Sequence, residues 1–235
     1  MSELSARLAD VRAHIESAAQ RAGREVSEIR LVAVSKTFPA EAVLEAVTAG
    51  LDRFGENRVQ EAAHKRPQVS AKTPRPLRWH LVGSLQRNKV RRALELFEVI
   101  ESVDRLELAH ELERGAARLG VRPAVLIQVN IDREPQKAGF LPEELAGAVE
   151  RIAALDHLNL CGLMTLPRAC KDPERVRPSF TRLRELLEHI NRGRTEGRRL
   201  RELSMGMSAD FEVAIEEGAT TVRIGSAIFG ERRRG

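Results

Sequence analysis

The segment RLVAVSKTFPAEAVLEAVTAG, residues 30–50, contains a complete strand–helix unit. Its first part is an apolar run rich in β-branched residues, which predicts a buried strand over 30–35. The second part has apolar residues at helical spacing and predicts a helix over 39–49, because Pro39 suits a first helical turn and Gly50 suits a C-terminal stop. A buried strand that leads directly into a helix is the unit from which parallel α/β sheets are built.

The same alternation recurs along the chain and sets the predicted fold. An amphipathic helix over 3–21 comes first, and further strands are expected at 51–54, 77–82, 97–102, 124–130, 158–165, 202–205 and 221–225. Further helices are expected at 57–64, 86–95, 105–119, 142–155, 178–192 and 209–217. Eight strands that alternate with helices predict an α/β protein, a single (β/α)8 barrel of the TIM type with an extra N-terminal helix. A doubly wound open sheet is the alternative.

The chain shows no linker that would divide it into two domains. The segments 65–76 and 167–178 contain proline and basic residues and are expected to be loops within one domain. A barrel of eight strand–helix units commonly has about this length. We therefore predict a single domain over residues 1–235.

The composition limits the classes of protein to consider. The net charge is +5 and the pI is about 9.7, but the densest basic stretches, 192–194, 198–201 and 232–234, are expected to be solvated loops and a frayed end. Aromatic residues make up 3% of the chain, so a stacking platform is not expected and a nucleic-acid binder, which rests on the pI alone, is the weakest hypothesis. No apolar run approaches the roughly 18 residues that span a membrane.

The spacing of the cysteines and histidines indicates neither a disulfide framework nor a metal site. Cys161 and Cys170 are the only cysteines and do not form a CxxC motif, which fits a reducing cytoplasm. The six histidines do not pair at metal-ligand spacings. We therefore expect a cytoplasmic protein without a metal site.

Lys36 is the first candidate functional residue, because it stands where the strand over 30–35 ends. The chain has six lysines against 33 arginines, so a position that needs only a positive charge is nearly always an arginine. Arginine cannot form a Schiff base, whereas a desolvated lysine loses its proton readily and attacks carbonyl groups. The alternative is that Lys36 extends from the strand end to water.

Two turns near the end of the chain are candidates for binding phosphate. Ser204-Met205-Gly206-Met207-Ser208 leads from the seventh predicted strand toward a helix, and Gly225-Ser226 follows the eighth. Barrels often bind phosphate at these two loops through backbone N–H groups, hydroxyls and a helix N-terminus. The alternative for Ser208 alone is an ordinary helix N-cap.

A Schiff-base lysine together with a phosphate site suggests pyridoxal 5′-phosphate as the cofactor. Arg223 lies in the eighth predicted strand, and a cation facing the ring nitrogen would keep that nitrogen unprotonated. The ring would then be a poor electron sink, which disfavours carbanion chemistry. The alternative for Arg223 is a salt bridge inside the barrel. Asn57 follows the second predicted strand and belongs to the same end of the barrel.

Six motifs in chain order resemble those of the pyridoxal phosphate homeostasis protein family, also called the YggS or PROSC family. They are VAVSK (32–36), FGEN (54–57), WHLVGSLQRNK (79–89), GLM (162–164), LSMGMS (203–208) and VRIGSAIFG (222–230). The resemblance runs from about residue 8 to residue 230. It implies a single-domain barrel related to the N-terminal domain of alanine racemase, with pyridoxal phosphate held as an aldimine on Lys36.

The resemblance also implies the residues around the cofactor. It places Arg223 at the ring nitrogen, Asn57 beside the cofactor, and the phosphate contacts at Ser204, Met207, Ser208, Gly225 and Ser226. Family members are regarded as carriers or regulators of vitamin B6 supply without established catalytic activity. The expected partners are therefore pyridoxal phosphate and the apo-enzymes that depend on it, and the expected role is intracellular vitamin B6 homeostasis by a non-enzyme.

The alternative function is a small racemase-like enzyme that uses pyridoxal phosphate. Alanine racemase takes its second base, a tyrosine, from a second domain, and this chain contains no tyrosine. Cys161, Cys170 and His80 are the other residues that could supply a second base. Because the second domain that supports the racemase dimer is also missing from the predicted architecture, a monomer is expected.

Overall fold

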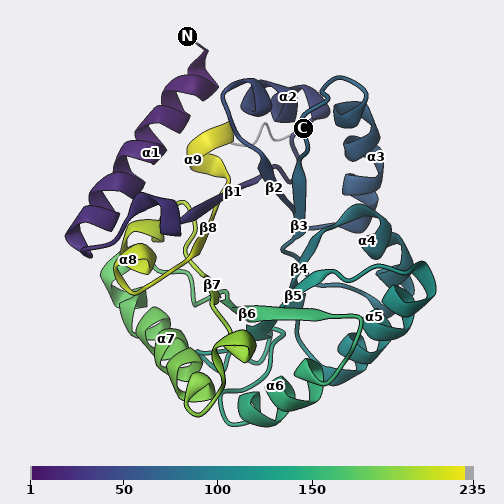
Figure 1. The fold of residues 1–235 in the computed structure, drawn as a ribbon. Coiled ribbons are helices and arrows are strands. Elements are labelled where there is room, and N and C mark those ends of the chain that lie inside the picture. The colour runs from purple at the N-terminus through teal and green to yellow at the C-terminus, as the bar shows by residue number, and fades with distance from the viewer. Residues whose placement is uncertain (1, 231–235) are drawn as a thin grey trace.

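The computed structural model describes residues 2–230 and shows a closed barrel of eight parallel strands surrounded by helices (Figure 1). The strands follow one another around the barrel in chain order: β1 (Arg30–Val34), β2 (Arg53–Glu56), β3 (Arg78–Leu81), β4 (Val99–Val103), β5 (Ala124–Val129), β6 (Asn159–Thr165), β7 (Glu202–Ser204) and β8 (Thr221–Ile224). Parallel pairing of β1 with β8, from Arg30 opposite Thr221 to Ala33 opposite Ile224, closes the sheet. The predicted barrel is confirmed, and the doubly wound alternative is wrong.

Helices connect successive strands across the outside of the barrel. They are α2 (Ala40–Thr48), α3 (Val59–Ser70), α4 (Val90–Leu96), α5 (Leu106–Leu119), α6 (Leu145–Ala153), α7 (Arg177–Asn191) and α8 (Phe211–Glu216), with α1 (Glu3–Arg21) before β1 and α9 (Ser226–Phe229) after β8. Short 3-10 turns lie at η1 (Val26–Glu28), η2 (Arg87–Lys89), η3 (Pro173–Val176) and η4 (Glu196–Arg198). The predicted N-terminal helix is thus present, and α1 packs against α8 and α9.

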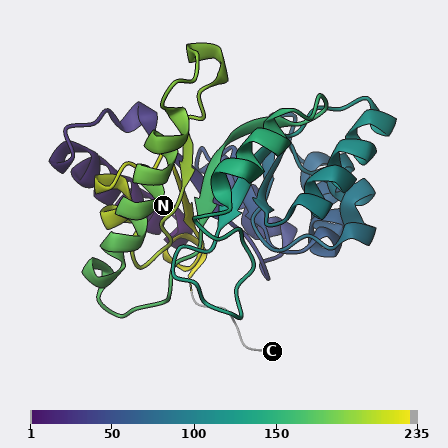
Figure 2. The same ribbon diagram turned by 90° about the horizontal axis from the view of Figure 1, so that it is seen from below.

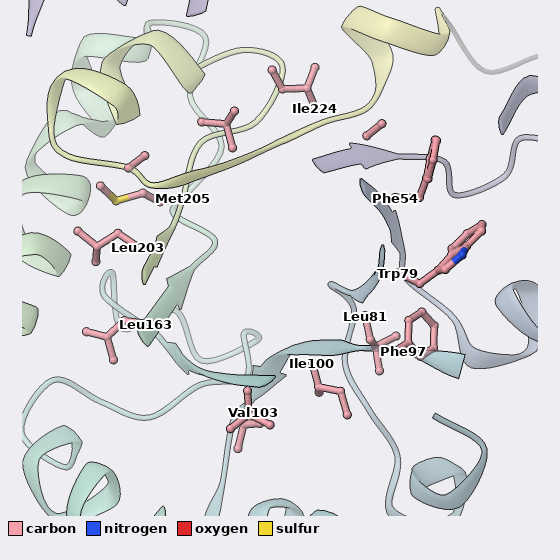
Figure 3. Packing of buried hydrophobic residues seen from close by; sticks show 14 of the residues in the cluster. Phe54, Trp79, Leu81, Phe97, Ile100, Val103, Leu163, Leu203, Met205 and Ile224 are labelled. Carbon is pink, nitrogen blue, oxygen red and sulfur yellow. The ribbon is translucent and has the colours of Figure 1, made fainter. Parts of the chain in front are cut away.

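The main hydrophobic core lies between the sheet and the helices. Phe54, Trp79, Leu81, Ile100 and Leu203 are among its fully or nearly fully buried side chains (Figure 3). Because side chains alternate along a strand, the residues between these point into the barrel.

The interior of the barrel differs in composition from this outer core. Its apolar part is a small separate cluster of Val99, Leu126 and Met164. The alternation places His80, Glu101, Ser204 and Arg223 on the same inner side of β3, β4, β7 and β8, and all of them are buried. Charged and polar groups therefore fill part of a space that branched apolar side chains usually fill in such barrels.

Several predicted boundaries differ from the structure, among them that of the strand expected over 51–54, which is β2 at Arg53–Glu56. The helix expected over 57–64 extends to Ser70 as α3, so residues 65–70 of the expected loop 65–76 are helical, with Pro67 inside the helix. The start of the helix expected over 86–95 is the turn η2. The four-residue helix α9 was not predicted, because a single helical turn carries no periodic pattern.

The two ends of the barrel carry different segments. Figure 2 shows the barrel from the side, and the loop with η4 projects where the strands begin. The basic stretch at 232–234 lies outside the described residues. Within residues 2–230, no helix has both the length and the hydropathy that crossing a membrane requires.

Candidate functional site

A cavity of about 610 Å³ opens at the end of the barrel where the strands finish. Seven of the eight predicted site residues line this one cavity: Lys36, Asn57, Met207, Ser208, Arg223, Gly225 and Ser226. Ser204 is fully buried and is not among the lining residues. Residues from both ends of the sequence are therefore brought together, as barrel closure requires.

Lys36 follows the last residue of β1 by two positions, and its backbone neighbours are held firmly. The carbonyl oxygen of Ser35 accepts a hydrogen bond from Lys65 Nζ at 2.7 Å, and the backbone N–H of Thr37 donates to Glu61 Oε1 at 2.5 Å. Thr37 has φ +68°, a left-handed conformation that is strained for a β-branched residue. Contacts from α3 thus fix an unfavourable backbone turn next to Lys36.

Lys65 and Glu56 form a buried ion pair behind this turn, which sequence analysis missed. The Lys65 Nζ–Glu56 Oε1 distance is 2.5 Å, and Ser35 Oγ donates to the same oxygen at 2.7 Å. Burial raises the pKa of Glu56, although the charge of Lys65 and the hydrogen bonds from Lys65 and Ser35 oppose that rise. The scarcity of lysine in the sequence could have drawn attention to Lys65, but the predicted loop over 65–76 conceals its burial.

The turn after β7 is shaped by Gly206 and Asp210. Gly206 has φ +91°, and a Cβ atom there would lie 2.6 Å from the Cβ of Ala214, so only glycine fits. The Asp210 carboxylate accepts from the backbone N–H of Met207 at 2.6 Å. The Gly206 carbonyl accepts from the N–H of Arg223 at 2.9 Å, which ties the turn to β8.

Ser208 joins the turns after β7 and β8. Its hydroxyl oxygen accepts from the backbone N–H groups of Gly225 and Ala227, both at 3.3 Å. The alternative that Ser208 caps the following helix is wrong, because Asp210 is the residue that precedes α8. The turn after β8 therefore presents two N–H donors to an oxygen acceptor at the cavity wall, where barrels bind phosphate.

Arg223 lines the cavity and also belongs to a network inside the barrel, as the alternative interpretation expected, while its contact with a ring nitrogen stays a prediction. Its Nη1 donates to Ser204 Oγ at 2.5 Å and lies 3.8 Å from Glu101 Oε2, and its Nη2 donates to the Thr165 carbonyl at 2.8 Å. Burial lowers the pKa of Arg223, against the opposing charges of Glu101 and Asp210. An arginine keeps its charge even so.

Asn57 reaches the cavity because its backbone contacts the loop after β3. A Cβ atom at Gly83 would lie 2.4 Å from the carbonyl oxygen of Asn57, so the two loops touch through backbone atoms. This close approach requires glycine and positions Asn57 at the cavity wall.

Lys137 is a second lysine in the cavity that sequence analysis did not select. Its Nζ donates to the carbonyl oxygens of Leu166 and Pro167, at 3.0 Å and 2.8 Å, and it pairs with Glu134. The side-chain amide of Asn130 donates to the Lys137 carbonyl at 3.2 Å and holds the loop after β5. Lys137 is therefore fixed at the opposite wall from β1.

The three residues considered as a second base do not line the cavity. His80 is buried beneath it and its Nδ1 lies 2.6 Å from Glu101 Oε1. Cys161 lines a separate hollow beside Arg201 where the strands begin, and burial raises the pKa of its thiol to about 11. Cys170 packs against the outer core. The structure therefore places none of the three at the wall of this cavity.

Comparison with known proteins decides the family. The family model described as "Alanine racemase, N-terminal domain" matches residues 7–233. A Pseudomonas aeruginosa protein named "Pyridoxal phosphate homeostasis protein" is 45% identical over 100% of this chain and 98% of its own length. The chain belongs to the alanine racemase N-terminal domain family, among the pyridoxal phosphate homeostasis proteins.

A second relative and a solved structure agree with this assignment. An Aquifex aeolicus protein of the same name is 44% identical over 97% of each chain. The structure of PipY from Synechococcus elongatus PCC7942 "with PLP bound" superposes with a TM-score of 0.85 at 36% identity, and the match covers 97% of this chain and 100% of PipY. The resemblance read from the six motifs is thus confirmed at the level of family and fold.

Among the residues that the structure describes, no group of three or more His, Cys, Asp or Glu side chains could hold a metal ion. The cavity of this family member instead offers an amine, hydroxyls, backbone donors and a buried cation. These groups fit an aldehyde that carries a phosphate and a basic ring nitrogen.

Proposed function

We propose that this protein binds pyridoxal 5′-phosphate covalently on Lys36 and serves as a carrier in vitamin B6 homeostasis. The observation that supports the proposal most strongly is that Lys36, the turn at Gly225 and Arg223 line one cavity. Bound pyridoxal phosphate supplies an aldehyde and an electron-accepting ring. The names of the relatives and the PLP-bound PipY structure support the same cofactor.

Lys36 would hold the aldehyde through a Schiff base. The ε-amine of Lys36 would supply the nucleophile for the aldehyde carbon, and the carbonyl oxygen would leave as water. The bond is reversible by the same route, so the cofactor can be released. The strained turn at Thr37, held by Glu61, keeps the lysine in one position.

The two C-terminal turns would bind the phosphate. Ser208, Ser226, Met207 and Gly225 line the cavity on that side, and the N–H groups of Gly225 and Ala227 already point to an oxygen acceptor. Such hydrogen bonds to an anion are stronger than those between neutral groups. Ser204 would act one layer deeper, since its hydroxyl is engaged with Glu101 and Arg223.

Arg223 at the ring nitrogen supports binding without turnover. A carboxylate at that position would stabilise the pyridinium form that carbanion chemistry needs, and a guanidinium does not. Among the described residues that line the cavity, Lys36, Lys137 and Arg223 are the titratable ones, and all three are basic. We infer that the cavity holds the cofactor without processing an amino acid, and that apo-enzymes in the cytoplasm receive it.

A racemase-like activity is the second candidate, favoured by one observation. Lys137 is a second amine at the cavity, and racemisation needs a base on each face of the substrate. The test is NMR of alanine in deuterated water with the loaded protein. Loss of the α-proton signal at a rate that depends on protein concentration would favour the enzyme over the carrier.

The decisive experiment for the carrier begins with the purified full chain. Pyridoxal phosphate is added, the absorbance is recorded, and the sample is reduced with borohydride and digested for mass mapping. We expect a pyridoxyl group on Lys36. A protein that stays colourless and takes up no pyridoxal phosphate would contradict the proposal.

A further inference from the structure

We infer that the buried pair His80–Glu101 acts through Ser204 to position Arg223, and so holds the ring nitrogen of the bound cofactor unprotonated. The inference rests on the proposed function and extends it to residues below the cavity. None of the comparisons assigns a role to His80 or Glu101.

The pair is connected to Arg223 by an unbroken chain of short contacts. His80 Nδ1 lies 2.6 Å from Glu101 Oε1, and Ser204 Oγ donates to Glu101 Oε2 at 2.6 Å. Arg223 Nη1 donates to Ser204 Oγ at 2.5 Å. The exposed fractions of these four residues are 5%, 1%, 0% and 3% in the order His80, Glu101, Ser204 and Arg223. Water therefore has little access to any link.

The direction of each hydrogen bond follows from the donor inventory. Arginine can only donate, so the Ser204 oxygen accepts from Arg223 and its single proton goes to Glu101. An ionised Glu101 can only accept, so His80 Nδ1 carries a proton and donates to it. All hydrogen bonds of this network therefore run toward the carboxylate of Glu101, from His80 on one side and from Arg223 through Ser204 on the other.

Glu101 is the counter-charge that a buried Arg223 needs. Burial by itself raises the pKa of Glu101, but the hydrogen bond and charge of His80, the charge of Arg223 and the hydrogen bond from Ser204 outweigh it and lower the pKa overall. An ionised Glu101 stabilises the charged guanidinium, because an unpaired buried charge is costly. Asp210 is the other carboxylate whose charge acts on Arg223.

The network also sets which donors Arg223 offers to the cavity. A guanidinium has five N–H donors, and hydrogen bonds from Nη1 to Ser204 and from Nη2 to Thr165 use two of them. Both nitrogens are thereby held by residues from β6 and β7, so the plane of the guanidinium is fixed. The remaining N–H groups can reach a ring nitrogen only in that orientation, and a guanidinium does not give up its proton to it.

One buried atom indicates that the network does more than fill space in the barrel. His80 Nε2 is buried and makes no hydrogen bond within residues 2–230. A buried polar atom without a partner costs free energy. Leucine would avoid this cost if the position needed only packing, whereas a histidine can hold Glu101 ionised by donating from Nδ1.

Ser204→Ala is the sharpest test, because it cuts the link between Glu101 and Arg223 without removing a charge. The matched control is Ser102→Ala, which deletes an equally buried hydroxyl on β4 whose partner is the Gly83 carbonyl. Both proteins are loaded with ¹⁵N-labelled pyridoxal phosphate, and the shift of the ring nitrogen is followed by NMR against pH.

In wild type and in Ser102→Ala, the ring nitrogen is expected to stay unprotonated through neutral pH. In Ser204→Ala it is expected to take up a proton at a higher pH than in wild type, and the affinity for pyridoxal phosphate is expected to fall by about tenfold.

The outcomes separate this inference from the proposed function. If Ser204→Ala loads on Lys36 and its ring nitrogen titrates as in wild type, the positioning role is wrong while the carrier proposal stands. If wild type shows no adduct on Lys36, the carrier proposal itself fails. An equal change in Ser204→Ala and Ser102→Ala would also contradict the inference, since it would show a general loss of packing.

Discussion

Lys36 lies beside a group of charged residues that are unusual in a hydrophobic layer. Lys65 has 4% exposure and Glu56 has none, and both lie where α3 packs on the sheet. A buried ion pair contributes little net stability compared with apolar residues, but removing one partner is strongly destabilising. The pair also donates to the Ser35 carbonyl, so its free energy is coupled to the position of Lys36.

Lys65→Met is expected to destabilise the protein by about 3 kcal/mol or more at neutral pH. Removing the lysine raises the pKa of Glu56 further, because burial then acts without the opposing charge. A carboxyl group with a raised pKa binds more protons in the folded state, so stability falls as pH rises above its unfolded value. The loss should therefore be small near about pH 4.5 and large near about pH 8.

Urea unfolding of wild type and Lys65→Met across this pH range measures the effect. Lys72→Met is the control, because Lys72 is exposed and lies 3.8 Å from its carboxylate partner Glu41. The double variant Lys65→Met with Glu56→Gln should recover much of the loss. If the difference in free energy of unfolding between wild type and Lys65→Met did not depend on pH, the coupling of Lys65 to the Glu56 carboxyl group would be wrong.

Lys36→Ala is expected to remove the pyridoxyl group from position 36 without unfolding the barrel. Lys36 lines the cavity at the end of the strands, whereas the main hydrophobic core lies between the sheet and the helices, so the truncation leaves that core intact. Circular dichroism checks the fold, and mass mapping after borohydride reduction checks the site. Lys137 serves as the internal control, since it is the other lysine of the cavity. A variant that kept the same borohydride-reducible absorbance as wild type would rule out Lys36 as the attachment site.

At the scale of elements, the turn after β7 is the least replaceable part of the site. Gly206→Ala would force a residue with a Cβ atom to φ +91°, 2.6 Å from Ala214 Cβ. We expect a loss of about 1–3 kcal/mol and weaker binding of pyridoxal phosphate, because the turn carries Met207 and Ser208 into the cavity.

The control for Gly206→Ala is a glycine at a position where alanine is expected to be favourable. Gly147 lies in α6 with no atom within 4 Å of an added Cβ, so Gly147→Ala should stabilise the protein by roughly 0.5–1 kcal/mol. Thermal unfolding and titration with pyridoxal phosphate distinguish the variants Gly206→Ala and Gly147→Ala. If Gly206→Ala matched wild type in both measurements, the turn would not be the phosphate-binding element.

The elements that sequence analysis misjudged share a cause. α3 was expected to end at 64, because Pro67 usually stops a helix, yet packing of Val69 in the core carries the helix to Ser70. The buried Lys65 was therefore assigned to a loop and overlooked. Periodicity and proline positions predict local structure, whereas the burial that overrides them depends on contacts distant in the sequence.

At the scale of the whole molecule, the sequence predicts the site best where reactive or polar residues coincide with predicted strand ends. Strand ends in a barrel meet at one end, so polar residues after β1, β2, β7 and β8 could be assigned to a single cavity before the structure was known. The inner network of His80, Glu101 and Ser204 could not be found this way, because pairing across the barrel interior leaves no signal in the spacing along the chain.

The surface of the molecule predicts its assembly state. Within residues 2–230, the large hydrophobic side chains that are well exposed are Val26 and Val121, at 44% and 38%. They are too few to form the apolar patch that a stable homodimer buries. We therefore expect light scattering to give a mass near 26.2 kDa at every concentration tested, with and without pyridoxal phosphate.

The assembly state bears on the carrier proposal through access to Lys36. A cofactor bound by a reversible bond can pass to an apo-enzyme only if the cavity at the end of the strands stays open to a second protein. A monomer leaves that end of the barrel uncovered. A dimer that persists on dilution and protects the Schiff base at Lys36 from borohydride would therefore contradict both the expected monomer and a role in direct delivery.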